Sequence, residues 1–246
     1  MIPISDEKVP GRGLGLVTIL FLVINVIVFV ALQLPNDSFT YGYSVVPQEI
    51  TTGQDLVEPQ VIEVDGQSVA IEQAPGPNPI FLTLLTSMFM HGGWAHLIGN
   101  MLFLWIFGDN VEHTMSRGIY VIFYVIAGLV GAFAQILIDP DSVIPSLGAS
   151  GAISGVLGAY LVLFPRNQVK VFMGQFLRSV PAMVVIGLWA VFQFINGFGS
   201  IVVSEQTTGG VAYMAHIGGF VVGLIGGFIA RATGAGRRLS EKTAPV

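Results

Sequence analysis

Four polar residues of this sequence are candidates for catalysis: one serine, two histidines and one asparagine. Ser150 stands in the glycine-rich stretch PSLGASGAISG, His96 and Asn100 stand four apart in GGWAHLIGN, and His216 lies in AYMAHIGGF. A neutral imidazole can take the proton of a serine hydroxyl and so activate it as a nucleophile. The resulting oxyanion needs hydrogen-bond donors, which His96, Asn100 and the Ser150 backbone N–H could supply. These residue types indicate acyl transfer, with His216 as the base.

The residues around Ser150 are small. We expect Gly148, Ala149 and Gly151 to bind the substrate, because glycine lets the backbone bend and come close to a ligand. Small residues also recur four apart near Ser150 and His216, in the sets Gly151/Gly155 and Ala215/Gly219/Gly223. Such sets let two membrane helices pack closely. They would bring Ser150 within reach of His216.

The candidate residues are expected to lie on membrane helices. The 246 residues are 53% hydrophobic and 10% charged, with a mean hydropathy of +0.76, whereas soluble domains carry about 25% charged residues. Six apolar stretches approach the ~20 residues that cross ~30 Å of hydrocarbon. They are 14–34, 94–111, 119–138, 150–164, 180–198 and 211–232. We therefore predict an all-α polytopic membrane protein with six transmembrane helices, the first of which is retained as a helix rather than cleaved as a signal peptide.

The basic residues predict the orientation. All ten fall on one side of the predicted helices: Lys8, Arg12, Arg117, Arg166, Lys170, Arg178, Arg231, Arg237, Arg238 and Lys242. The positive-inside rule places that side, with the N-terminal segment 1–13 and the tail 233–246, in the cytoplasm. The other side holds an acidic insertion, 35–79, in which the alternation VIEVDGQSVAIE predicts a β-hairpin around Asp65-Gly66. The segment 80–90 is apolar but too short to span.

The candidate residues are expected at one depth. The helix at 150–164 would be only about 22 Å long, which recesses Ser150 below the outer surface. His96, Asn100 and His216 also stand near the outer ends of their predicted helices. We expect all four to converge in the outer half of the bundle, in a cell membrane, facing the extracytoplasmic side. Since no Arg-rich and Ser-rich leader is evident, we expect a prokaryotic plasma membrane.

Three motifs resemble those of the rhomboid intramembrane serine proteases. They are GASG at 148–151, AHIGGFVVG at 215–223 and HGGWAHLIGN at 91–100, and the resemblance extends over 80–232. It implies a six-helix catalytic core in which Ser150 and His216 form a dyad without an acidic third member, while His96 and Asn100 stabilise the oxyanion. It also implies that Glu112 is a structural acid of the loop after the second helix. The implied substrate is a transmembrane helix, cleaved near its outer end after a small residue.

Two positions depart from the family pattern. Leu82-Thr83 stands where many members have Trp-Arg, and Ser154 stands where a tyrosine often stacks on the histidine. Neither change removes a reacting group, so we expect an active endopeptidase. The alternative is a catalytically weak or inactive rhomboid-like protein that binds transmembrane helices.

Other membrane chemistries lack the residues they need. There is no H-E-x-x-H zinc motif, and Asp109 has no partner aspartate for an aspartyl protease. With no cysteine, the chain has no thiolate metal site. The expected partners are the lipid bilayer and transmembrane protein substrates, without a metal, a cofactor or nucleic acid. The remaining polar groups are expected to order the external loop (His91) or to form interhelical hydrogen bonds (Asn25, Gln135, Gln193 and Asn196).

Overall fold

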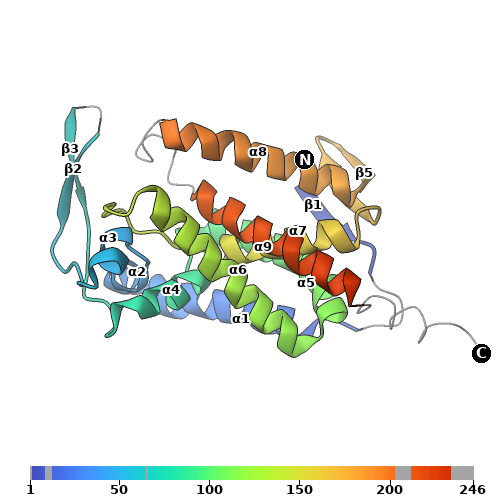
Figure 1. Cartoon of the computed structure of the whole chain (residues 1–246), viewed down its shortest axis with the longest axis horizontal. Coiled ribbons are helices and arrows are strands. Elements are labelled where there is room, and N and C mark those ends of the chain that lie inside the picture. Colours follow the sequence, from blue (N-terminus) through green and yellow to red (C-terminus); the bar gives the residue numbers. More distant parts are fainter. Residues whose placement is uncertain (1, 9–12, 65, 203–211, 234–246) are drawn as a thin grey trace, which may run out of the picture.

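The computed structural model describes residues 2–8, 13–64, 66–202 and 212–233. Its long helices run alongside one another (Figure 1). They are α1 (Leu16–Ile27), which continues as the π-helix η1 (Val28–Gln33), then α5 (Trp94–Met115), α6 (Arg117–Ile138), α7 (Ser150–Leu163), α8 (Ala182–Val202) and α9 (Tyr213–Ala232). Each of these helices covers most of one predicted apolar stretch. The largest extensions are those of α5, which ends at Met115 rather than 111, and α8, which ends at Val202 rather than 198.

Helix α7 is the central element. Of its 14 residues, 11 are buried, and it packs against α5, α6 and α9. A helix covered on all sides has no polar stripe, which explains why most of its residues are small or apolar, with Ser150, Ser154 and Tyr160 as the polar exceptions. A Cβ added at Gly219 or Gly223 of α9 would overlap the main chain of Gly151 or Gly155. The prediction that small residues bring these two helices together is therefore confirmed.

Several helices have the composition of membrane spans. Within the described part of the chain, Leu16–Gln33, Arg117–Ile138 and Tyr213–Ala232 are long and apolar enough to cross a bilayer, whereas Ile80–Phe89, Ser150–Leu163 and Ala182–Gly197 are apolar but shorter. Large apolar side chains are exposed along α1, α6 and α9, among them Leu20, Val23, Ile27, Ile122, Ile126, Phe133, Ile225 and Phe228. Such an apolar surface is typical of contact with lipid. The full set of six spans and its orientation stays a prediction.

The insertion 35–79 has structure of its own. It contains α2 (Asp37–Tyr43), α3 (Pro47–Thr52), β2 (Gln60–Val64) and β3 (Gln67–Ile71). The two strands pair in antiparallel register from Gln60↔Ile71 to Val64↔Gln67, so the predicted hairpin is confirmed, although Asp65 lies outside the described residues. Figure 1 shows the hairpin extending away from the helices. After it come three short turns of helix, η2 (Ile80–Leu82), α4 (Thr83–Thr86) and η3 (Ser87–Phe89). We call this end of the bundle the insertion end.

The prediction of an all-α chain is wrong at the opposite end. There β1 (Ile2–Asp6), β4 (Gln168–Met173) and β5 (Phe176–Pro181) form an antiparallel sheet in the order β1-β4-β5. The sequence QVKVFMGQFLRSV carried a signal, because two alternating runs flank Gly174, whose φ of 62° suits a tight turn. The N-terminal strand β1 pairs with β4, which lies more than 160 residues later in the sequence, and no local pattern predicts this pairing. We call this end the sheet end.

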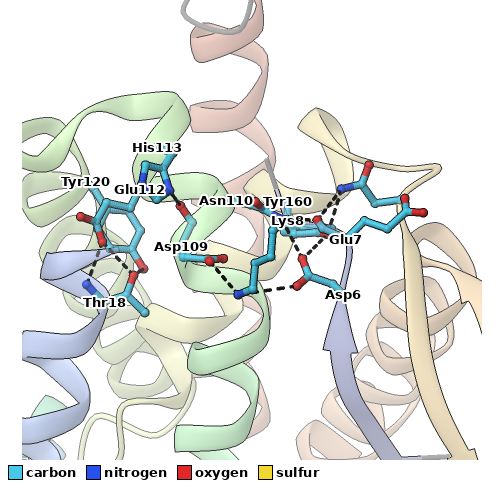
Figure 2. Close-up of polar contacts among 11 residues, drawn as sticks. Asp6, Glu7, Lys8, Thr18, Asp109, Asn110, Glu112, His113, Tyr120 and Tyr160 are labelled. Atoms are coloured by element: carbon cyan, nitrogen blue, oxygen red, sulfur yellow. Dashed lines mark hydrogen bonds and ion pairs between the residues drawn. The ribbon is translucent and has the colours of Figure 1, made fainter. Parts of the chain in front are cut away.

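Polar contacts attach the N-terminal strand to the helices at the sheet end (Figure 2). The Asp6 carboxylate accepts hydrogen bonds from Asn110 Nδ2 and Tyr160 Oη, both at 2.7 Å. Lys8 Nζ lies 2.6 Å from Asp109 Oδ2. These contacts tie β1 to α5 and α7, the helices that carry His96, Asn100 and Ser150 at their other ends. We call them the N-terminal clasp.

Glu112 fastens α1 to α5 beside the clasp (Figure 2). Its carboxylate accepts hydrogen bonds from the backbone N–H groups of Val17 and Thr18, at 3.1 and 2.8 Å, and from Thr18 Oγ1 at 2.9 Å. An anionic group at the first turn of a helix satisfies otherwise unpaired N–H groups and complements the helix dipole. Glu112 is thus a buried structural acid, as the resemblance implied, but it lies within α5 rather than in a loop.

Candidate active site

Ser150 and His216 meet at the insertion end. Ser150 is the first residue of α7, and its Oγ lies 2.8 Å from Nε2 of His216, in the first turn of α9. Gln135 of α6 holds the start of α9 in place, because its Oε1 accepts hydrogen bonds from the backbone N–H groups of Met214 and Ala215. The predicted pairing of a serine with an imidazole is therefore present in the geometry.

A cavity of about 700 Å³ opens above this pair. Its lining residues include Ser150, His216, His96, Asn100, Gln135, Trp189, Pro47, Pro145 and Ser146. A smaller recess of about 30 Å³ adjoins it and is bordered by Gly148, Ser150 and Gly151. The four residues that the sequence predicts to converge all line the large cavity. Ala149 is fully buried and stands among the lining residues of neither space, so its expected contact with substrate has no support in the structure.

His96 presents its Nε2 to the space beside Ser150. The backbone N–H of Gly92 donates to Nδ1 of His96 at 3.3 Å, and because Nδ1 accepts, the ring proton belongs on Nε2. Gly148 has a φ of +138°, and a Cβ placed there would lie 2.9 Å from Cε1 and Nε2 of His96 and 3.4 Å from Ser150 Oγ. The missing side chain at position 148 therefore leaves room for an atom between a donor and the serine hydroxyl.

Asn100 lies one turn further along α5. Its side chain is buried, and within the described part of the chain its Nδ2 has no hydrogen-bond partner. A buried donor without a partner is uncommon and asks for an explanation. Since Asn100 lines the cavity with His96 and Ser150, an acceptor bound in the cavity would supply the missing partner.

Other predicted polar residues have structural partners. Ser154 Oγ donates to Ser150 O at 2.6 Å, within its own helix. Asn25 and Asn196 likewise donate to carbonyls of their own helices, those of Phe21 and Phe192, so for these two the predicted interhelical bonds are wrong.

His91 orders the chain before α5 through its backbone. Gln33 at the end of η1 accepts from His91 N at 2.8 Å and donates to His91 O at 3.1 Å. Leu82 and Thr83 are the two residues before α5 that differ from the family pattern. Thr83 is buried and its hydroxyl donates to Ile80 O, whereas Leu82 is exposed. The hydrogen bonds of His91 and Thr83 thus shape the chain before α5 rather than the Ser150–His216 pair.

Gln193 is the residue whose role the sequence concealed. Its Oε1 lies 2.7 Å from Nδ1 of His216, on the side of the ring opposite Ser150. The sequence predicts an interhelical hydrogen bond for Gln193 but not its partner. No local pattern could, because Gln193 and His216 are 23 residues apart on different helices.

Comparison with known proteins gives one consistent result. A family model described as "Rhomboid domain" matches residues 79–233. The "Rhomboid protease GluP" of Bacillus subtilis (strain 168) is 38% identical over 149 residues, which are 61% of this chain and 25% of that protein. "Rhomboid protein 1, mitochondrial" of Saccharomyces cerevisiae is 30% identical over 151 residues, 60% of this chain and 41% of that protein. The "Putative rhomboid protease YdcA" of Bacillus subtilis is 28% identical over 148 residues, 59% of this chain and 63% of that protein. The chain thus spans less than two thirds of the length of each of these relatives.

Proposed function

Because the chain belongs to the rhomboid family, whose model covers 79–233, we propose that it is an intramembrane serine endopeptidase. The observation that carries this proposal is the 2.8 Å contact between Ser150 Oγ and His216 Nε2 at the wall of the cavity. Three of the described helices are apolar and long enough to cross a membrane, so the reaction takes place at a membrane. Two relatives are named rhomboid proteases, which supports the same activity.

The reaction begins at the serine. Ser150 Oγ attacks the carbonyl carbon of a peptide bond while its proton passes to Nε2 of His216. The protonated imidazole then gives that proton to the leaving amine, and an acyl-enzyme remains on Ser150. Water attacks the ester, again with His216 as the base, and the acid product leaves as Ser150 regains its proton. The negative charge at the tetrahedral stages falls near His96 Nε2–H, Asn100 Nδ2–H and the Ser150 backbone N–H, which serve as the donors of the oxyanion site.

The substrate is proposed to be a transmembrane helix cleaved near its end. The recess of about 30 Å³ bordered by Gly148 and Gly151 is small, which supports a small residue, such as alanine, before the scissile bond. When a substrate helix unwinds, its peptide N–H and C=O groups lose their hydrogen bonds within the helix. In the hydrocarbon region these groups need new partners, which the polar residues of the cavity can provide.

The proposed membrane arrangement has six spans with both termini in the cytoplasm of a cell membrane. Its support is the charge distribution, because the sheet end carries Lys8, Arg166, Lys170 and Arg178, while the insertion 35–79 carries acidic residues but no lysine or arginine. The positive-inside rule then places the sheet end inside and the cavity on the extracytoplasmic side.

Labelling with a fluorophosphonate tests the proposal. The reagent loses fluoride to an activated serine, so the detergent-purified protein should label, and Ser150→Ala and His216→Ala should not. Ser154→Ala is the matched control, because Ser154 lies one turn away and its hydroxyl donates to a carbonyl of its own helix. Cleavage of a transmembrane reporter with alanine or leucine before the scissile bond then tests the substrate, and alanine should be preferred.

The second candidate is a rhomboid-like protein that binds transmembrane helices without cutting them. The observation in its favour is Ser154, which bonds Ser150 O and stands where the resemblance expects a ring against His216. A folded wild-type protein that neither labels nor cleaves, yet retains a transmembrane helix peptide in detergent, would establish this alternative and exclude the protease.

A further inference from the structure

We propose that Gln193 is a positioning residue that fixes the tautomer and orientation of His216. This inference rests on the proposed Ser150–His216 chemistry and extends it by a third residue, contributed by α8. Gln193 Oε1 lies 2.7 Å from His216 Nδ1, and Ser150 Oγ lies 2.8 Å from His216 Nε2. The imidazole is thus held on both nitrogens, between α8 and α7.

The chemistry of an amide oxygen gives the contact its direction. An amide oxygen accepts hydrogen bonds and cannot donate, so the ring proton must be on Nδ1 of His216. The lone pair is then on Nε2, which faces Ser150 and can take its proton. With the proton on Nε2 instead, the imidazole could not act as the base for Ser150.

Burial makes this contact consequential. Gln193 is 6% exposed, although most large side chains around it on α8, among them Leu188, Val191, Phe192 and Ile195, are exposed. A buried side-chain amide needs a hydrogen-bond partner. For Gln193 that partner is Nδ1 of His216.

A second side chain of α8 supports the same ring. The centroid of Trp189 lies 6.1 Å from that of His216, with the rings inclined by 38°. Helix α7 offers no ring at the equivalent place, because Ser154 occupies the position one turn after Ser150. Tyr213 of α9 itself meets the His216 ring edge-on, with the ring centroids 6.5 Å apart. The hydrogen bond to Nδ1 and the Trp189 ring are both contributed by α8, so the orientation of the proposed base depends on α8 lying against α9.

The experiment separates tautomer control from simple helix packing. Gln193→Leu removes the acceptor at similar volume, and Gln193→Glu keeps an oxygen in its place. The matched control is Asn196→Leu, which removes an amide one turn away that donates to Phe192 O of its own helix. Each variant is assayed for its rate of fluorophosphonate labelling and for its thermal unfolding midpoint.

We expect Gln193→Leu to label about 10- to 100-fold more slowly, a part of the ~10²–10⁴ that a positioned base contributes. Gln193→Glu should recover most of the rate, and Asn196→Leu should match wild type. Equal rates for wild type and Gln193→Leu would overturn the proposal while leaving the protease intact, and so would a Gln193→Glu variant as slow as Gln193→Leu.

The tautomer can be read without activity. In the Ser150→Ala background, the ¹⁵N chemical shifts of His216 should show a protonated Nδ1, and adding Gln193→Leu should shift the population toward protonated Nε2. Unchanged shifts would mean that Gln193 only packs α8 against α9, which contradicts the proposal. Because this readout needs no labelling, failure of the protease proposal and failure of this one are distinguished.

Discussion

Gly148 and His96 share a space that admits no side chain at position 148. The backbone there has a φ of +138°, a conformation that side-chain-bearing residues rarely adopt, and a Cβ would press on the His96 ring at 2.9 Å. Asn100 borders the same cavity with an unpartnered Nδ2, so far as the described residues go. The side chains proposed for the oxyanion site therefore stand around an open space rather than bonding one another.

Gly148→Ala should inactivate the protein, because the added methyl group displaces the His96 donor. Loss of one oxyanion donor lowers turnover by about 10²–10³, and fluorophosphonate labelling should slow by about that factor. Gly118→Ala on α6 is the control, since a Cβ there meets nothing within 4 Å. Labelling of Gly148→Ala at the wild-type rate would show that this space is not where the reaction occurs.

Asn100→Ala should lower turnover of a transmembrane reporter by about 10²–10³ while leaving the thermal unfolding midpoint unchanged. The unfolding midpoint should not change because Asn100 Nδ2 has no hydrogen-bond partner within the described part of the chain, so the substitution breaks no hydrogen bond. Turnover and thermal unfolding are to be measured on one preparation. A variant that cuts normally would remove Asn100 from the proposed oxyanion site.

At the scale of elements, the N-terminal strand joins parts of the chain that are far apart in sequence. β1 pairs with β4, and Asp6 reaches α5 and α7 through Asn110 and Tyr160. The Asp6 side chain is fully inaccessible to solvent, and burial raises the pKa of its carboxyl group from 3.8 to about 6, against the hydrogen bonds from Tyr160 and Asn110 and the charge of Lys8. The N-terminal clasp thus braces the ends of α5 and α7 that lie opposite the candidate site.

Asp6→Ala should destabilise the protein by about 1–3 kcal/mol, because Tyr160 Oη and Asn110 Nδ2 lose a buried acceptor. Thermal or denaturant unfolding in detergent measures the change. Glu7→Ala is the neighbouring control. Glu7 is exposed, and its carboxylate accepts one solvent-exposed hydrogen bond, from Gln168 N, so its loss should change stability by no more than about 0.5 kcal/mol. Equal stability of the two variants would mean that the clasp contributes nothing.

At the scale of the whole molecule, the insertion is docked on the segment that leads into Ser150. Val45 pairs with Ser146 as an isolated bridge, Gln48 N donates to Ser142 O, and Gln73 Nε2 donates to Val143 O at 2.7 Å. Pro47, the first residue of α3, lines the cavity itself. The insertion is therefore a wall of the candidate site as well as an appendage.

Glu49 of α3 makes the stability of the insertion sensitive to pH. Burial raises the pKa of its carboxyl group from 4.5 to about 7, opposed by the hydrogen bond from Leu56 N and assisted by the nearby Asp55. The folded insertion therefore retains a proton between about pH 4.5 and pH 7 that the unfolded chain has released, so the contribution of this group to stability falls as pH rises through that window.

Glu49→Gln should remove this pH dependence, because glutamine keeps an acceptor for Leu56 N–H without a charge to bury. Its thermal unfolding midpoint minus that of wild type should grow in favour of the variant from pH 5 to pH 8. The exposed Glu58→Gln should show no such trend. A constant difference for Glu49→Gln across this range would contradict the assignment.

Features that have a local signal could be predicted from the sequence. Apolar runs located the six main helices, and the alternation around Gly66 located β2 and β3. Motif spacing singled out Ser150, His216, His96 and Asn100 as candidates, and all four line one cavity. Each of these signals repeats within a few residues, with the period of a helix or strand or within a short motif, so a single stretch of chain contains it.

Contacts between segments far apart in the sequence are visible only in the folded chain. Gln193 contacts His216 across 23 residues of sequence, and Asp6 contacts Tyr160 across 154. The insertion contacts the 142–146 segment across 70 residues or more. These contacts depend on how the helices pack against one another, for example where Gly219 and Gly223 lie against α7. Helix packing leaves no periodic pattern in the sequence from which the contacting residues could be predicted. A polar residue in an apolar run shows that a partner exists, and only the fold shows which one.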